Sequence, residues 1–78
     1  MIKNYVMYGY NLADENDTGY FGKNLQIVTD INAAMLFPNK PRKNKRGFGS
    51  PQQWLNFLND PNEKLNHGFK FHLVMTNL

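Results

Sequence analysis

Alternating polar and apolar residues predict a β-strand near each end of the chain. Residues 2–12 are rich in Tyr and Val, and their two faces carry Ile2, Val6, Tyr8 and Tyr10 on one side and Lys3, Tyr5 and Met7 on the other. Residues 69–75 alternate more regularly, which is the pattern of a half-buried strand. Because tyrosines lie on both faces of residues 2–12, we expect that strand to be central in its sheet or covered on both sides.

Two polar stretches divide the residues that follow the first strand. Residues 13–19 combine Asp and Asn with a final Gly, and these residue types favour a turn because they bond their own backbone or adopt positive φ. Tyr20–Phe21 continues as a short strand, and residues 22–24 form a second predicted turn. Residues 25–28 then favour β structure, and we expect them to pair with the first strand in a hairpin or a three-stranded meander.

Two short helices are predicted in the second half of the chain. The first spans residues 31–37, because Thr29 or Asp30 can accept from the unpaired N–H groups as an N-cap. Pro38 ends this helix, since proline has no N–H to donate. The second helix spans residues 51–59, because the serine, proline and glutamine at its start form a capping box and an apolar stripe follows.

These elements predict a small α+β domain that covers residues 1–78. The expected order is ββ(β)ααβ, an antiparallel sheet of three to four strands with both helices on one face. A chain this short buries only roughly 60–65% of its unfolded surface, so its stability margin is thin. Either residues 2–12 or residues 69–75 can form the free edge of the sheet, and an unpaired edge makes a homodimer one of the expected options.

Positive charge is concentrated in one basic loop, at about residues 38–49. The net charge is +3, and five cations fall within seven residues that contain no acid: Lys40, Arg42, Lys43, Lys45 and Arg46. Repulsion among them favours an extended, solvated segment. Two interpretations stay open, a loop that keeps the protein soluble or a loop that contacts a polyanion, either nucleic acid or an acidic protein surface.

Two motif matches fail because of the residues around them. Asp14, Asn16 and Thr18 match the first half of a calcium-binding loop, but Leu25 occupies the position that requires a bidentate Glu. Residues 46–49 match the start of the RNA-recognition consensus, yet a helix-opening sequence follows where a strand with stacking aromatics should continue. We therefore predict a plain turn at the first match and keep the second as a minor alternative.

The sequence predicts no catalytic, metal or cofactor site. It has no Cys, and its two histidines, His67 and His72, have no third ligand at a suitable spacing. Its one serine, Ser50, already serves as an N-cap, and no glycine-rich phosphate loop opens a helix. The longest apolar run, residues 33–37, is too short to span a membrane, and the N-terminus is too polar for a signal peptide. We therefore expect a non-enzymatic cytoplasmic protein without contact to a membrane.

The tyrosines are the second group of candidate functional residues. All four of them lie on adjacent predicted strands, more than so small a core can bury, and tyrosine is well suited to interfaces or to stacking with bases. Trp54 and Phe57, at helical spacing, are instead expected in the core. The predicted partner- or nucleic-acid-binding residues are Lys40, Arg42, Lys43, Lys45, Arg46, Phe48, Tyr8, Tyr10 and Tyr20.

The abundance of Asn, Lys, Tyr and Phe is typical of AT-rich codons. Together with the runs at residues 5–8, 17–21, 27–34 and 54–58, it resembles the small accessory, host-takeover proteins of phages of low-GC Gram-positive bacteria. The resemblance implies a non-enzymatic protein in the host cytoplasm that binds a host component, such as a CRISPR nuclease or a replication or transcription protein. The basic loop departs from the acidic pattern of DNA mimics among such inhibitors.

The first hypothesis is therefore a non-catalytic phage-type protein that binds and inhibits or modulates a host nucleic-acid-processing protein. A second hypothesis is a small basic domain that binds DNA or RNA directly, with little sequence preference. A third is a structural subunit of a larger assembly.

Overall fold

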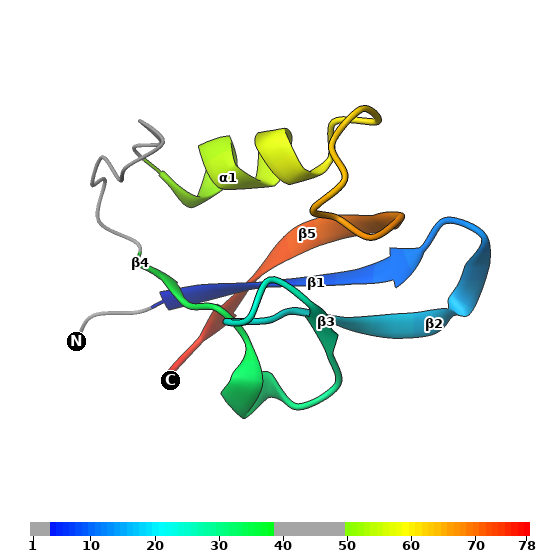
Figure 1. The fold of residues 1–78 in the computed structure, drawn as a ribbon. Coiled ribbons are helices and arrows are strands. Elements are labelled where there is room, and N and C mark those ends of the chain that lie inside the picture. Colours follow the sequence, from blue (N-terminus) through cyan, green and yellow to red (C-terminus); the bar gives the residue numbers. More distant parts are fainter. Residues whose placement is uncertain (1–3, 39–49) are drawn as a thin grey trace.

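The structure, a computed structural model, describes residues 4–38 and 50–78 (Figure 1). Five strands and one α-helix occur in this part of the chain, with a short 3-10 helix between two of the strands. Their bounds are β1 Asn4–Asn11, β2 Asp14–Phe21, β3 Ile27–Val28, η1 Ile31–Ala33, β4 Phe37–Pro38, α1 Pro51–Leu58 and β5 Phe69–Thr76. The strands form one curled antiparallel sheet, and α1 packs over one of its faces.

Strand β1 is the centre of the sheet. It pairs with β5 over its whole length, from Asn4 opposite Thr76 to Asn11 opposite Phe69. Its other edge is shared, because β2 pairs with the second half of β1 and β4 pairs with the start. Strand β3 extends the sheet beyond β2. The first strand is therefore central, one of the two expected arrangements, and the alternative that residues 2–12 form a free edge was wrong.

The predicted fold class was wrong in its balance of helix and sheet. Five strands and one α-helix replace the expected three to four strands and two helices. The missing helix is the one expected at residues 31–37. Asp30 does cap this segment, since its side chain accepts from the N–H of Asn32, but the 3-10 turn ends at Ala33 and Phe37 enters β4.

Backbone bonds to the end of β2 and to Lys23 just after it explain why residues 31–37 do not form an α-helix. The N–H of Met35 donates to the carbonyl of Phe21 at 2.8 Å, and Ala33 accepts from the N–H of Lys23 at 3.0 Å. Helices of two turns are marginal by themselves, so a sheet edge that offers these partners outcompetes the helical bonds. Phe37 is then placed opposite Tyr5, with its ring in the core.

The predicted turn at residues 13–19 was also wrong, because β2 already begins at Asp14. The chain reverses at Leu12 and Ala13, where the Asn11 side chain accepts from the N–H of Ala13 at 2.9 Å. The pairing of β1 with β2 shifts register between Tyr10 and Asn11. Residues 14–18 are exposed on both faces of the strand. Polar side chains can therefore occupy this end of the hairpin.

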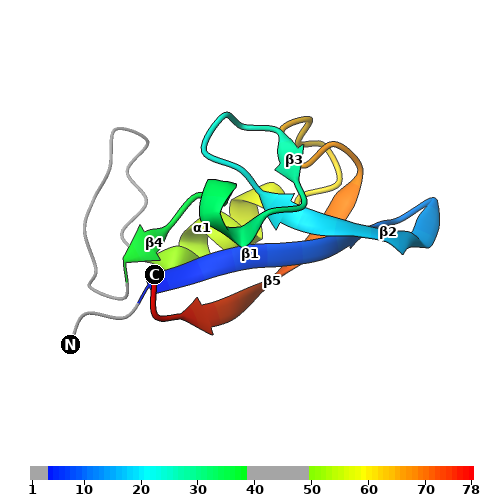
Figure 2. The same cartoon turned by 90° about the horizontal axis from the view of Figure 1, so that it is seen from below.

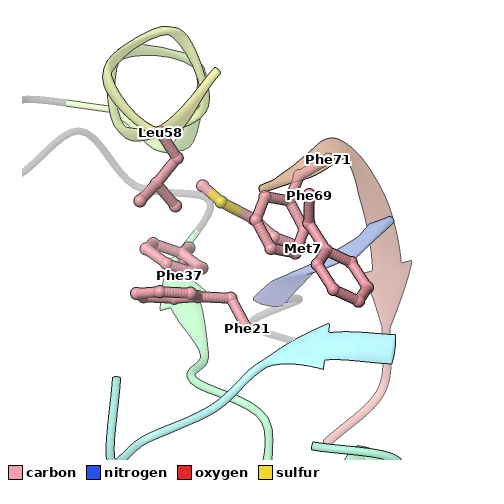
Figure 3. Close-up of a cluster of buried hydrophobic side chains, with 6 residues drawn as sticks. All are labelled: Met7, Phe21, Phe37, Leu58, Phe69 and Phe71. Atoms are coloured by element: carbon pink, nitrogen blue, oxygen red, sulfur yellow. The ribbon is translucent and has the colours of Figure 1, made fainter. Parts of the chain in front are cut away.

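The core lies between α1 and the sheet, as Figure 3 shows. Its buried cluster consists of Met7, Phe21, Phe37, Leu58, Phe69 and Phe71. Gly9 lets β1 and β5 approach closely, because a Cβ there would collide with the carbonyl oxygen of Lys70. Trp54 and Phe57 of α1 pack against this cluster, as expected for core residues.

Side-chain hydrogen bonds stabilise both ends of helix α1. Ser50 accepts from the N–H of Gln53 at 3.3 Å, which confirms the predicted N-cap. At the other end Asn59 donates to the carbonyl of Phe71 at 3.0 Å and accepts from its N–H at 2.9 Å. Buried Asn66 donates to the carbonyl of Leu58 at 2.6 Å. These asparagines hold the link between α1 and β5.

None of the helices within residues 4–38 and 50–78 has the length and apolar character that a membrane span requires.

Candidate binding surface

The face of the sheet that points away from α1 carries a row of aromatic rings across three strands. Tyr8 on β1 lies opposite Tyr20 on β2 and opposite His72 on β5. The ring centroids of Tyr8 and Tyr20 are 4.9 Å apart, and those of Tyr8 and His72 are 5.8 Å apart with the rings nearly perpendicular. Figure 2 shows this side of the sheet, with α1 behind it.

A second row lies next to the aromatic one. Tyr10 on β1 is opposite Thr18 on β2 and Lys70 on β5, and residues directly opposite in a sheet share a face. Tyr10 is half-buried, whereas Thr18 and Lys70 are exposed. We call this surface the outer face and define it by Tyr8, Tyr10, Thr18, Tyr20, Lys70 and His72.

The outer face is hollowed between the two rows. The hollow has a volume of about 400 Å³ and is lined by Tyr8, Gly9, Tyr10, Glu15, Thr18 and His72. Aromatic rings, three hydroxyls and a carboxylate therefore converge on one concave patch. A few polar groups in an otherwise aromatic hollow fix the orientation of what binds there, and the rings supply contact area.

The charge around the hollow is mixed. Glu15 lines it, Asp14 and Asp17 are exposed on the same strand, and Lys70 is the cation nearest in register. In the described ranges, 4–38 and 50–78, three lysines stand against six carboxylates: Lys23, Lys64 and Lys70, and Asp14, Glu15, Asp17, Asp30, Asp60 and Glu63. The positive net charge of the chain therefore comes from residues outside these ranges.

Three of the predicted binding residues are brought together by the sheet, since Tyr8, Tyr10 and Tyr20 all belong to the outer face. Tyr5 packs against the core instead. The other predicted residues lie outside the described part of the chain: Lys40, Arg42, Lys43, Lys45, Arg46 and Phe48.

Sequence reasoning missed His72, Thr18 and Glu15 as members of this surface. His72 alternates with the core residues Phe69 and Phe71, so the sequence indicates its face, but its neighbour Tyr8 depends on the strand register. Thr18 and Glu15 were missed because the residue types of their segment favour a turn. The other histidine, His67, lies elsewhere, with its Nε2 2.8 Å from the carbonyl oxygen of Leu25.

The arrangement has the chemistry of a contact surface. Among the residues that the structure describes, no group of three or more His, Cys, Asp or Glu side chains could hold a metal ion. The hollow gathers one imidazole, one carboxylate and three hydroxyls around an open space. These groups can donate and accept hydrogen bonds and stack against a ligand.

Comparisons with protein-family models, with curated proteins and with solved structures find no match to this chain. Function is therefore inferred from the residues of the outer face and from the charge pattern of the sequence.

Proposed function

We propose that this protein is a non-catalytic binding protein that contacts a partner protein through its outer face. The observation that carries the proposal is the packed row of Tyr20, Tyr8 and His72 beside a hollow of about 400 Å³. Rings that already pack against each other lose little further freedom when a partner covers them. Tyrosine is enriched among the residues that carry most of the binding energy of protein interfaces.

The charge of the outer face favours a protein partner over a nucleic acid strand. A strand that stacked on Tyr8 and Tyr10 would bring its phosphates close to Glu15, with Asp14 and Asp17 on the same hairpin. Single-stranded nucleic acids bind where cations follow the stacking rings. Here Lys70 is the one cation that the structure places in register with these tyrosines on the described strands.

The basic segment, residues 40–46, supports a partner with an acidic surface. Its five cations would speed the encounter with such a partner by electrostatic steering, while the outer face supplies the buried contact. The resemblance described above supports a phage-type inhibitor as the class of this protein. It supports a host protein that processes nucleic acids as the partner. In that setting the protein binds a host nucleic-acid-processing protein in stoichiometric amounts and inhibits or modulates it.

Capture of a partner by matched variants tests the proposal. The tagged protein is incubated with a lysate of a low-GC Gram-positive host, with and without nuclease, and Thr18→Arg is compared with Thr29→Arg. Both threonines are exposed, but only Thr18 lines the hollow. A partner protein retained after nuclease by the wild type and Thr29→Arg, and lost at least about tenfold with Thr18→Arg, supports the proposal. Equal retention by the two variants would overturn the role of the outer face.

Direct binding of DNA or RNA is the second candidate, and the five cations within seven residues favour it. It predicts that retention in the same experiment disappears with nuclease. It also predicts a steep loss of affinity for duplex DNA with salt, with a log–log slope of about −0.9 for each phosphate neutralised. A partner that withstands nuclease argues against it.

A further inference from the structure

The outer edge of β5 carries backbone groups that point away from the rest of the sheet. Asn59 bonds to both the N–H and the C=O of Phe71, so these groups point away from β1. The register of β1 with β5 runs without a shift from Phe69 to Thr76, and the direction of backbone groups alternates along a strand. The N–H and C=O groups of Leu73 and Met75 therefore point outward as well.

Within residues 4–38 and 50–78, the outward groups of Leu73 and Met75 have no hydrogen-bond partner. Protected sheet edges usually carry a charged side chain, a proline or a bulge. Lys70 is the one charged residue of β5 and lies before Phe71, so residues 71–78 contain no Asp, Glu, Lys, Arg or Pro, and β5 has no bulge against β1. In Figure 2, β5 lies along the outer side of the sheet. The side chain of Met75 is also 50% exposed at this edge.

We propose that a second copy of this chain pairs with this edge, so that two β5 strands run antiparallel across a two-fold axis at Val74. In this register Leu73 of one copy lies opposite Met75 of the other, and each such pair exchanges two hydrogen bonds, so all eight outward groups of the two copies are satisfied. The stretch is uncharged, so the same segment from both copies meets without repulsion. A second copy is therefore the occupant that fits both the spacing of the bonds and the charge.

The length of this contact is limited by the chain itself. Asn59 already occupies the outward groups of Phe71, which stops the pairing at that residue. Only Leu73 and Met75 of each copy exchange backbone hydrogen bonds, so the contact is short, and short contacts belong with weak, transient interfaces. The dimer is therefore in equilibrium with the monomer, and its fraction rises with protein concentration. Both outer faces lie on the same side of the joined sheet, because paired strands share their faces.

Sedimentation equilibrium over a concentration series tests the dimer, with Met75→Lys and Leu12→Lys as matched variants. Both replace an exposed apolar side chain by lysine, but Leu12 is 66% exposed at the tip of the β1–β2 hairpin, away from the edge. The wild type and Leu12→Lys are expected to reach the mass of a dimer at high concentration. Met75→Lys is expected to dimerise at least about tenfold more weakly, because its cation would lie against an apolar partner strand.

Amide hydrogen exchange provides the second readout. The amides of Leu73 and Met75 exchange quickly in dilute wild type and become protected as the dimer forms, whereas in Met75→Lys they stay fast at the same concentration. A wild type that is monomeric at up to about 1 mM, the weak end of specific association, overturns the proposal. So does a dimer that Met75→Lys leaves intact, or protection of both amides in the monomer.

Discussion

Asparagine side chains take the place of backbone partners at the junction between α1 and β5. Asn59 pairs with both polar groups of Phe71 as a neighbouring strand would, and Asn66, which is 9% exposed, bonds to the carbonyl of Leu58 and the N–H of Gly68. Nothing in the spacing of these residues marks such roles, since they depend on which strand lies within reach. Twelve asparagines in the chain offer many equivalent candidates. The roles of Asn59 and Asn66 therefore cannot be predicted from the sequence, because they depend on tertiary contacts.

Replacing Asn59 by alanine is predicted to destabilise the protein by about 1–3 kcal/mol. The substitution leaves the N–H and C=O of Phe71 without partners in a half-buried setting, and unpaired groups of this kind cost that much. Asn56→Ala is the control, because Asn56 is exposed and bonds only to the side chain of Gln52. Its expected effect is within about 0.5 kcal/mol. Urea denaturation of both variants measures the difference, and equal effects would contradict the role given to Asn59.

The elements differ in how much of them the sequence determines. The strands at residues 4–11 and 69–76 and the helix at 51–58 were predicted because period and capping agree with the tertiary structure. Only the end of β2, Tyr20–Phe21, was predicted as a strand, because the polar residues 14–19 match turn chemistry. Pairing with β1 makes these polar residues part of the strand. Strand β4 was read as a helix because apolar residues at 31–37 suit either structure over so short a length. Contacts with Phe21 and Tyr5 decide that choice.

Substitution of Phe37 tests the assignment of this residue to strand β4 instead of a helix. Its ring is buried and lies 5.6 Å from the ring of Trp54, so Phe37→Ala is predicted to cost about 3–5 kcal/mol. Leu36 is half-buried and outside the core cluster, so Leu36→Ala is predicted to cost clearly less. Thermal unfolding of the two variants by circular dichroism gives the order of stability. A reversed order would mean that residues 31–37 pack in another way.

At the scale of the whole molecule, the positive charge and the outer face come from different parts of the sequence. The described residues are acidic on balance and carry the aromatic hollow, while the basic segment supplies the positive net charge. The tyrosines of the candidate site were predictable because they exceed what a small core can bury. The hollow was not, because His72, Thr18 and Glu15 reach it only through the register of three strands and through a strand that was read as a turn.

This separation predicts different kinetic effects for the two regions. Replacing all five cations of the basic segment by glutamine should slow association with the partner by about tenfold or more at low salt and flatten its salt dependence, because steering acts on the encounter. Thr18→Arg should instead speed dissociation, since it disturbs the close contact. Surface plasmon resonance at several salt concentrations separates the two. An unchanged association rate after removal of the cations would contradict the role of the segment.

Site-specific photo-crosslinking tests the central claim, that the outer face is the partner-binding surface, most directly. A photoreactive phenylalanine replaces Lys70, at the rim of the outer face, or Gln52, exposed on α1 over the opposite face of the sheet. After nuclease treatment of the lysate and illumination, we predict that the position 70 probe forms a covalent product with one partner protein and the position 52 probe forms none. Products from position 52 alone would contradict the account and move the binding surface to the helix.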